Sequence, residues 1–489
     1  MASQPATKRP NIVLFLVDDM GWQDTSEPFW HRRTPFNERY HTPNMERLAR
    51  GGMKFTQAYA CAVCSPTRVS LLTGQNAARH RVTNWTLYRD KAQDAASPVL
   101  RYPPWNVNGI SQQPGVERTV HAQCLPSHLQ QAGYRTIHVG KAHFGAVDTP
   151  GADPLNLGFA VNIAGHAAGG PGSYLSEQGF SAQWRGGDPV WDIPGLDKYH
   201  NSGVFLTEAL TREANSAMEQ ACDEGQPFFL YMSHYAVHVP FAEDRRFIDK
   251  YRDAGLPEQE AMYAALLEGM DKSLGDILDC IDRLGIAEDT VVLFMSDNGG
   301  LSAHGRDGQA HSHNKPLSSG KGSVHEGGIR EPMIVRWPGV TAADSLCDDY
   351  LIIEDFFPTI LQMAGAPAVE GVDGRSFVPL LRGEKGSAER PLFWHYPNNW
   401  GPEGPGIGSY SAIRKGDLKL IYYHEPDRTQ RYELFDIAAD IGETTNLAAD
   451  RPETVARLGG ELHRFLLEVD AQMPIDLQTN RPVPLPGDE

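Results

Sequence analysis

The sequence predicts an α/β fold built around a buried, mainly parallel β-sheet, and three observations support this prediction. Apolar runs without polar alternation occur at Asn11–Val17, Thr136–Val139, Phe228–Met232 and Thr290–Met295. Such runs are typical of strands that are covered on both faces. Segments with apolar residues at helical spacing lie between them. Strands that alternate with helices indicate right-handed βαβ connections and therefore parallel pairing.

The predicted helices between these strands follow from capping residues and from periodicity. The first covers residues 42–51, where Thr42 is the predicted N-cap, Pro43 stands in the first turn and Gly51 closes the helix. The other three are predicted from apolar residues at spacings of three and four, at Val120–Ala132, Thr207–Ala221 and Tyr263–Leu284.

Two long segments, Thr83–Val116 and Gly165–Asp192, show no clear period. Loops of this length are uncommon unless they are functional or disordered. Their content of aromatic and amide side chains favours ordered loops, which either contact a substrate or only pack against the core.

Beyond about residue 370 the pattern changes to short alternating segments. Antiparallel strands are predicted at Ser411–Arg414, Lys419–Tyr423 and Tyr432–Phe435, and a terminal helix at Glu453–Val469. The proline-rich Asn480–Glu489 is expected to be a loose or docked tail. We therefore divide the chain into an α/β domain at residues 10–370 and a small α+β subdomain at residues 371–489.

Length, composition and charge exclude several classes of protein. The length of 489 residues allows two to four domains, or one large α/β domain with an appendage. A content of 40% hydrophobic and 22% charged residues is typical of a folded globular protein. The longest apolar run, Ile12–Val17, is far shorter than the ~20 residues of a membrane span. The net charge of −18, from 44 basic and 62 acidic residues, argues against nucleic-acid binding. Any anion site must be a local cluster of Lys, Arg and His.

The cysteines and the N-terminus bear on the cellular compartment. Six cysteines are too few for a disulfide scaffold, although the count allows one or two disulfides. Met1–Pro10 is polar and has no apolar core, so it is not a secretory signal. If Met1 is the native start, the protein is expected in the cytoplasm.

Polar clusters follow all four predicted strands of the sheet. They are Asp18-Asp19, Gly140-Lys141-Ala142-His143, Ser233-His234 with His238 nearby, and Ser296-Asp297-Asn298-Gly299. Ligands of open α/β sheets bind outside the carboxyl ends of the strands. If the four strands are neighbours, their clusters share one pocket.

The chemistry of these clusters indicates a hard cation beside an anion site. Asp18, Asp19, Asp297 and Asn298 offer oxygen ligands, which suit Ca²⁺ or Mg²⁺ better than a transition metal. The other side of the pocket would hold basic side chains, namely Lys141, His143, His238 and Lys321. A cation combined with fixed basic groups predicts a site for a sulfate or phosphate ester.

Cys64 is the candidate nucleophile of this site. Ser65 as cap and Pro66 in the first turn would place Cys64 at a helix N-terminus, which favours an anion, with Arg68 one turn further. Taken alone, Cys61-x-x-Cys64 is also compatible with a redox pair, half a zinc site, a disulfide or two buried thiols.

Cys64-Ser65-Pro66-Thr67-Arg68 followed by Leu71-Leu72-Thr73-Gly74 resembles the signature of the formylglycine-dependent sulfatases, in particular bacterial carbohydrate sulfatases and arylsulfatases. Further motifs resemble this family in its order over residues 10–335: Asn11-Ile12-Val13, Asp18-Asp19-Met20-Gly21, Gly140-Lys141-Ala142-His143, His238-Val239-Pro240, Ser296-Asp297-Asn298-Gly299, Gly320-Lys321-Gly322 and Glu326-Gly327-Gly328-Ile329-Arg330-Glu331-Pro332. Arg414–Leu420 and Glu433–Asp436 resemble its C-terminal subdomain.

The resemblance implies an alkaline-phosphatase-like fold, in which helices sandwich a large mixed, mainly parallel sheet and a small subdomain carries an antiparallel sheet. It implies that a maturation enzyme converts Cys64 to formylglycine (3-oxoalanine). It also implies a Ca²⁺ site, with Mg²⁺ as the alternative, formed by Asp18, Asp19, Cys64, Asp297 and Asn298. The family's location outside the cytoplasm, periplasmic or secreted, would apply here if Met1 is an artificial start.

The same resemblance implies roles for the remaining residues. Arg68 and Lys141 would stabilise the hydrated aldehyde, and Lys141, Lys321 and His238 would hold the sulfate. His238 or Lys321 would protonate the leaving oxygen, and His143 would take the proton whose removal expels sulfate. Asp297 would help to deprotonate the attacking hydroxyl.

The favoured substrate is a sulfated carbohydrate, namely galactose sulfate or N-acetylgalactosamine sulfate, because the long loops are rich in aromatic and amide side chains. Candidate substrate contacts are His166, His234, His311 and His395, the last at the start of a segment that runs to Trp400. One alternative is a phosphate monoester or diester hydrolase of the same superfamily. The other is a non-catalytic, calcium-dependent glycan-binding protein, which would require an unmodified Cys64.

Overall fold

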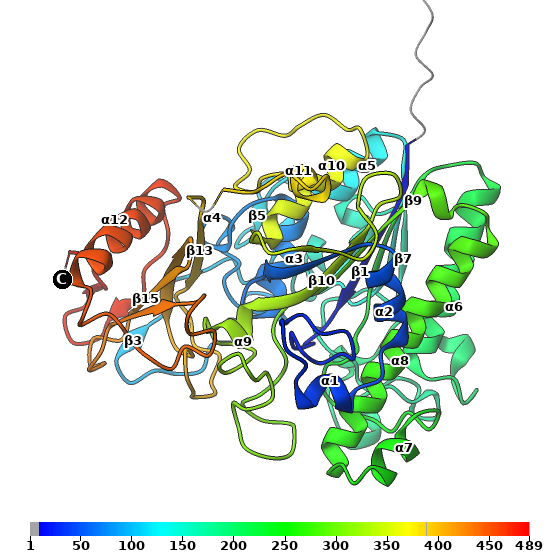
Figure 1. The fold of residues 1–489 in the computed structure, drawn as a ribbon, viewed down its shortest axis with the longest axis horizontal. Coiled ribbons are helices and arrows are strands. Elements are labelled where there is room, and N and C mark those ends of the chain that lie inside the picture. Colours follow the sequence, from blue (N-terminus) through cyan, green and yellow to red (C-terminus); the bar gives the residue numbers. More distant parts are fainter. Residues whose placement is uncertain (1–8, 388, 489) are drawn as a thin grey trace, which may run out of the picture.

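A nine-stranded sheet runs through the centre of the computed structural model, which describes residues 9–387 and 389–488 (Figure 1). The strand order is β11-β2-β10-β9-β1-β8-β6-β7, and β12 pairs with β2. The bounds are β1 (Asn11–Val17), β2 (Met53–Tyr59), β6 (Arg135–Gly140), β7 (Val161–Ile163), β8 (Phe228–Ser233), β9 (Thr290–Ser296), β10 (Arg330–Arg336), β11 (Ser345–Cys347) and β12 (Leu351–Ile352). The N-terminal segment considered above lies, up to Lys8, outside the described residues.

The four strands predicted from apolar runs are direct neighbours in this sheet. They lie in the order β9-β1-β8-β6, and each adjacent pair is parallel. Leu14 in the central strand pairs with Leu293 on one side and Tyr231 on the other. Parallel neighbours bring their carboxyl ends to one edge, which confirms the geometric basis of the shared-pocket prediction.

The sheet is mixed because β10 runs antiparallel to both β9 and β2. The sequence pattern predicts neither β2 nor β10 as a strand. Pro332 interrupts the apolar run of β10, and the pairing with β2 shifts register between Glu331 and Met333. A proline without an N–H is accommodated in a sheet at such an irregularity.

Helices cover both faces of the sheet (Figure 1). Successive side chains of β1 point to opposite faces of the sheet. Ile12 and Leu14 belong to the core that contains α3 (Cys64–Thr73), α5 (Leu125–Gln131) and α10 (Phe356–Met363). Val13 and Phe15 belong to the core that contains α2 (Pro43–Arg50), α6 (Leu206–Asp223) and α8 (Glu258–Arg283). The helix bounds are α1 (Pro35–Arg39), α2 (Pro43–Arg50), α3 (Cys64–Thr73), α4 (Ala77–His80), α5 (Leu125–Gln131), α6 (Leu206–Asp223), α7 (Ile248–Asp253), α8 (Glu258–Arg283), α9 (Glu326–Ile329), α10 (Phe356–Met363), α11 (Val378–Leu381) and α12 (Pro452–Glu468).

The predicted helix at Val120–Ala132 is wrong in its first part. Residues 120 and 121 form the short strand β5 (Val120–His121), which pairs in parallel with β4 (Ile110–Ser111). The helix α5 begins only at Leu125, so that Pro126 stands in the first turn, where its missing N–H costs no helical hydrogen bond. The other three predicted helices are present, within a few residues, as α2, α6 and α8.

A four-stranded antiparallel sheet carries the C-terminal part and packs against α12 through its own apolar cluster. Its strands are β13 (Pro391–Tyr396), β14 (Tyr410–Lys415), β15 (Leu418–Tyr423) and β16 (Tyr432–Asp436). The tail is docked, because β18 (Arg481–Pro482) pairs with β17 (Ile475–Asp476), and β17 pairs with β3 (Leu100–Arg101). The boundary near residue 370 stays a prediction, since one apolar cluster contains residues from both sides of it, such as Tyr59 and Trp394.

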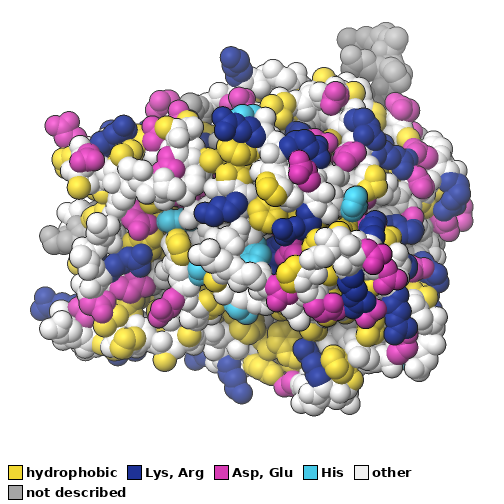
Figure 2. All heavy atoms as spheres, turned by 60° about the horizontal axis from the view of Figure 1, so that its bottom comes forward, with side chains coloured by type: hydrophobic (Ala, Val, Ile, Leu, Met, Phe, Trp, Pro, Cys, Tyr) yellow, Lys and Arg dark blue, Asp and Glu magenta, His cyan; other side chains and the backbone are white. Residues whose placement is uncertain are grey.

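The surface mixes acidic and basic side chains, and several histidines gather near the middle of the face shown in Figure 2. Within the described part of the chain, no helix has both the length and the apolar character needed to cross a membrane.

Candidate active site

The structure brings together, at the carboxyl ends of the central strands, all the residues predicted as catalytic groups or metal ligands. Ion pairs, hydrogen bonds and a shared cavity connect them. They are Asp18, Asp19, Cys64, Arg68, Lys141, His143, His238, Asp297, Asn298 and Lys321.

A sharp turn after β1 lets Asp18 and Asp19 both face this site. Asp19 has a φ of +60°, in the left-handed region that aspartate tolerates better than most residues. Its N–H donates to Asp297 Oδ1 at 3.3 Å, and the N–H of Met20 donates to Ser296 Oγ at 3.0 Å. The turn therefore lies at Asp19 itself.

Three acids and three bases pair inside the site. Lys141 Nζ lies 2.7 Å from Asp18 Oδ2, Lys321 Nζ lies 2.7 Å from Asp19 Oδ1, and Arg68 Nε donates to Asp297 Oδ2 at 2.9 Å. All six side chains are buried. Buried charges are tolerated only when they are paired. Here three negative and three positive formal charges balance.

Two oxygens of this cluster have no hydrogen-bond partner among the described residues, namely Asp18 Oδ1 and Asn298 Oδ1. The amide of Asn298 is oriented by its Nδ2, which donates to Asp19 Oδ1 at 2.8 Å. Burial raises the pKa of Asp18 well above its ordinary value, although the ammonium of Lys141 opposes this. Unpartnered buried oxygens are costly, and a hard cation would satisfy them, so this donor set fits Ca²⁺ or Mg²⁺.

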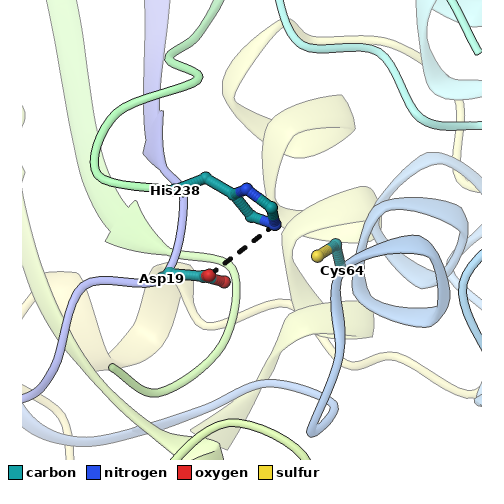
Figure 3. A group of neighbouring side chains, drawn as sticks. All are labelled: Asp19, Cys64 and His238. Carbon is teal, nitrogen blue, oxygen red and sulfur yellow. Dashed lines mark ion pairs between the residues drawn. The ribbon is translucent and has the colours of Figure 1, made fainter. Parts of the chain in front are cut away.

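Cys64 lies between two groups of possible metal ligands. Its Sγ forms one group with ligand atoms of Asp18 and Asp297, and another with those of Asp19 and His238, each within 4.8 Å. Figure 3 shows the sulfur facing the space between Asp19 and His238. Helix α3 begins at Cys64 itself, after the N-cap Val63, which corrects the prediction that Ser65 caps the helix.

The cysteine is a poor nucleophile in its unmodified form. Burial raises the pKa of the Cys64 thiol to about 11, so the thiol is protonated at neutral pH. The neighbouring Cys61 is also a free thiol, and burial raises its pKa in the same way. Neither thiol belongs to a disulfide.

Two histidines present one free ring nitrogen each to the site. His143 has a φ of +55°, and its Nε2 donates to the carbonyl of Thr86 at 2.8 Å. Its Nδ1 has no hydrogen-bond partner among the described residues. His238 Nδ1 donates to the carbonyl of Val239 at 2.6 Å, which turns Nε2 toward Asp19 Oδ2 at 3.8 Å (Figure 3).

Both histidines are neutral at pH 7 in the ligand-free protein. Burial lowers the pKa of His238 to about 3, helped by Lys321 and opposed by Asp19. Burial also lowers the pKa of His143 well below its ordinary value, helped by Lys141 and Arg68. A neutral imidazole with a free nitrogen can accept a proton or a hydrogen bond.

Two glycines let a loop lie directly on these imidazoles. A Cβ on Gly169 would stand 2.3 Å from His143 Cε1, and a Cβ on Gly170 would stand 2.7 Å from His238 Nδ1. The loop Gly165–Asp192 therefore touches the site through its glycines.

A cavity of about 250 Å³ opens above this charged floor. Its walls contain residues that the sequence analysis missed: Trp85, Trp191, Leu301, His304 and Pro402, together with Trp400 at the end of a segment it named. Trp85 and Trp191 lie in the two long loops set apart for their aromatic content, which is the signal that could have identified them.

None of the four histidines predicted as substrate contacts is among the described residues that line this cavity. His234 is buried, with Nε2 2.9 Å from Ser273 Oγ, and His395 is buried between Ser411 and the carbonyl of Gln472. The ring of His166 packs on Tyr235, and His311 lies beside Ser319.

Known proteins resemble this chain over most of its length. A family model described as "Sulfatase" matches residues 10–366, and one described as "N-sulphoglucosamine sulphohydrolase, C-terminal" matches residues 320–472. A "Sulfatase" of Formosa agariphila is 28% identical, covering 98% of this chain and 93% of that protein. The "N-acetylgalactosamine-6-sulfatase" of Canis lupus familiaris is 31% identical, covering 88% of this chain and 82% of that protein.

The fold also resembles solved structures. The crystal structure of Ps i-CgsB in complex with k-i-k-neocarrahexaose superposes with a TM-score of 0.73 at 24% identity, covering 98% of this chain and 95% of that one. At this level of identity the likeness concerns the fold.

Proposed function

The chain belongs to the sulfatase family of sulfuric ester hydrolases, and from this premise we propose that it removes sulfate from a sulfated carbohydrate through a formylglycine made from Cys64. The observation that carries the proposal is the position of Cys64 on the floor of the cavity, close to Asp18 and Asp297 on one side and to Asp19 and His238 on the other, with Lys321 and His143 lining the same cavity. The N-acetylgalactosamine-6-sulfatase relatives support a galactose or N-acetylgalactosamine sulfate as the substrate.

The nucleophile requires a modification of Cys64, because the buried thiol keeps its proton at neutral pH. Once Cys64 is converted to formylglycine, the hydrated aldehyde supplies a hydroxyl as nucleophile. Arg68 is held one turn along α3 by Asp297, by the carbonyl of Lys141 and by Ser233 Oγ at 2.6 Å. Since Cys64 is only 3% exposed, the maturation enzyme would have to act on this segment before the chain folds around it.

A divalent cation would be held by Asp18, Asp19, Asp297 and Asn298, and the unpartnered Oδ1 atoms of Asp18 and Asn298 fit it. When bound, the cation supplies positive charge to a sulfate oxygen and to the nucleophile. Its two charges would also offset the desolvation that raises the pKa of Asp18.

Lys321 and His238 flank the place where the leaving oxygen would lie, because both line the cavity beside Cys64. Asp19 raises the pKa of Lys321, so this ammonium carries a proton in the free protein. His238 is neutral there, and a bound sulfate, being an anion, would raise the pKa of His238 toward the range of a general acid.

His143 has the geometry of a general base for the release of sulfate. Its Nε2–H is committed to the carbonyl of Thr86, so the tautomer leaves a lone pair on Nδ1. The buried Nδ1 has no partner among the residues that the structure describes, and the lowered pKa keeps it unprotonated at neutral pH. It can therefore take a proton from the second hydroxyl of the hydrated side chain.

The test begins with mass spectrometry of the tryptic fragment Phe55–Arg68 from protein made in a host with the maturation enzyme. The expected fragment is lighter than the thiol form by about 18 Da, whereas ordinary oxidation adds oxygen atoms to the sulfur. The Cys64→Ala variant should lose all measurable hydrolysis of an aryl sulfate. Cys61→Ala, its matched control in the same fragment, should keep the activity within a few-fold.

Two outcomes would contradict the proposal. A preference for an aryl phosphate over the matched aryl sulfate would favour a phosphoester hydrolase on the same scaffold. An unmodified Cys64 in a competent host, with calcium-dependent sugar binding and no turnover, would favour a glycan-binding protein.

A further inference from the structure

Three tryptophans, Trp85, Trp191 and Trp400, stand around the cavity above the charged floor. We infer that they close it into a pocket for a single terminal sulfated sugar ring, and that Asp94 is the positioning residue that holds two of these three walls together. The inference rests on the proposed function and adds to it the site of attack on a sugar chain.

The cavity has room for one ring and its sulfate. Its volume of about 250 Å³ falls below the ~300–1,000 Å³ of pockets that bury drug-sized ligands. An enzyme that acts within a chain needs a groove that is open at both ends. Here the walls come from separate segments: Trp85 follows α4, Trp191 ends the turn Pro189–Trp191, and Trp400 follows β13.

The chemistry of the walls suits a sugar ring. Indoles offer flat apolar faces, and Leu301 and Pro402 add further apolar surface to the same walls. The charged groups lie below, at Lys321 and His238. A ligand with one anionic group and a ring that has an apolar C–H face matches both the charged floor and the apolar walls.

The wall of Trp400 stands directly beside the anion-binding floor. A Cβ on Gly322 would lie 2.1 Å from Trp400 Cε3, so the indole covers the residue next to Lys321. The ring of His304 lies 5.8 Å from that of Trp400. Trp400 and His304 therefore form one wall of the cavity next to Lys321.

The walls of Trp85 and Trp191 are joined to each other. Tyr88, three residues after Trp85, donates its hydroxyl to Asp188 Oδ2 at 2.6 Å. The carbonyl of Trp191 accepts a hydrogen bond from the N–H of Gly172 at 2.7 Å, in the loop that lies on the histidines.

Asp94 joins the wall of Trp85 to that of Trp400. Its Oδ1 accepts from Asn84 Nδ2 at 3.0 Å, from Asn398 Nδ2 at 2.8 Å and from the N–H of Asn399 at 3.2 Å. Its Oδ2 accepts from Trp105 Nε1 at 2.9 Å.

Asn84 completes this connection. It is fully buried, and its Oδ1 accepts from the N–H of Trp85 at 2.9 Å and from the hydroxyl of Tyr396 at 2.8 Å. Asp94 does not line the cavity, so it would act only through the residues it bonds.

The first experiment compares substrates with the matured enzyme. The probes are tetrasaccharides of galactose or N-acetylgalactosamine units that carry sulfate either only on the terminal ring or only on an internal ring. We expect kcat/KM to be at least about 100-fold higher for the terminal sulfate, because an internal ring would clash with the walls. Values within threefold of each other would overturn the inference, as would action on an aryl sulfate but on none of the sugars.

The same panel separates this inference from the proposed function. An aryl sulfate and the sulfated monosaccharides test the reaction without testing the walls. If neither is hydrolysed, the proposed function fails and the inference falls with it. If they are hydrolysed and internal sulfates are too, only the inference fails.

The second experiment tests Asp94 with variants. Asp94→Ala should raise KM for the terminally sulfated sugar about tenfold and reduce the preference for terminal over internal sulfate, with a smaller change in kcat. Asp94→Asn keeps one acceptor oxygen and should recover most of that preference. Trp400→Ala should reduce the preference even if Asp94→Ala fails to fold.

The matched control is Asp153→Ala, since Asp153 also lies in a loop and accepts from the N–H of Leu155 and from Asn162 Nδ2. It should leave the substrate preference unchanged. An unchanged preference in both Asp94→Ala and Trp400→Ala would overturn the role of the walls.

Discussion

The floor and the walls of the cavity are built in different ways. The floor consists of charged side chains at strand ends, and Asp18, Asp297 and Arg68 there have no exposed surface. The walls consist of indoles on loops and on the C-terminal subdomain, such as Trp191 and Trp400. The floor suits a reaction on a sulfate group, which many substrates share, whereas the walls suit the recognition of one substrate.

The two regions are also held in place by different forces. Parallel hydrogen bonding between β9, β1 and β8 sets the positions of the floor residues. Side-chain bonds across long sequence distances hold the walls, such as those of Asp94 to Asn398 and of Arg306 to Glu260. Substitutions in the floor should therefore abolish the reaction, and those in the walls should change affinity, selectivity or local stability.

The largest effect is expected from Asp297→Asn in the floor. This change removes the counter-charge of the buried Arg68 and weakens a ligand oxygen of the cation site. We expect hydrolysis of an aryl sulfate to fall by about 1,000-fold or more, since charge stabilisation in a buried site is worth several kcal/mol. Breaking a buried pair should also cost about 3–5 kcal/mol of unfolding free energy.

The control is Asp276→Asn, which breaks the exposed pair with Lys272 on α8. It should cost at most about 1 kcal/mol and leave activity intact. Activity of Asp297→Asn within tenfold of the wild type would contradict the assigned role of Asp297.

The second effect is expected from removal of the divalent cation. Dialysis against a chelator should lower both activity and Tm, because a ligand that binds only the folded state stabilises it. Calcium added back should restore both, and a magnesium series would rank the two ions. A chelated enzyme with unchanged activity and Tm would show that the unpartnered oxygens of Asp18 and Asn298 hold no required ion.

The third effect concerns the leaving group. His238→Ala should reduce hydrolysis of a sugar sulfate by about 100-fold, and that of an activated aryl sulfate by less than tenfold, because a poor leaving group depends most on general-acid help. The measurement is kcat/KM on both esters at the same pH. Equal losses on the two would exclude His238 as the acid and leave Lys321.

The smallest effect on chemistry is expected from Glu260→Gln, which tests how the wall loop is held. Glu260 pairs with the buried Arg306, whose loop also carries Leu301 and His304 of the cavity wall. Arg306 and Tyr40 help to lower the pKa of Glu260 to about 2, against burial. Because the folded pKa lies below the ordinary 4.5, the pair stabilises the protein above pH 4.5 and loses this effect as pH falls toward 2.

At pH 7 the unfolding free energy of the wild type should be about 3 kcal/mol higher than that of Glu260→Gln. This difference in unfolding free energy should vanish near pH 2. Thermal unfolding at several pH values measures this difference. Glu258→Gln, exposed on the same helix, should show a much smaller one. A difference that does not depend on pH would mean that Glu260 acts by packing.

The sequence was a good guide where local pattern determines structure. Apolar runs identified the four central strands, and the acids and bases that follow them met as predicted. The pattern failed where pairing with distant segments decides the conformation. Residues 120 and 121 form a strand because β4 is beside them, and Pro332 interrupts the apolar run of β10, which pairs with β2.

The histidines show the same limit within the site. His143 and His238 belong to local motifs, and the structure places both on the cavity. His234 follows a strand end as His238 does, but it points to Ser273 on α8 and away from the cavity. The packing of α8 against the strand end decides that His234 contacts Ser273, and the local sequence does not show this contact.

The sequence by itself determined the central strands, the order of the charged residues after them and the place of Cys64 at the start of a helix. These features depend on residues close together in the chain, through strand periodicity and through short motifs. The tertiary structure alone decided the tautomers of the two histidines, the unpartnered oxygens and the walls of the cavity. Those depend on contacts such as Asp94 with Asn398, which join segments about 300 residues apart and leave no local pattern.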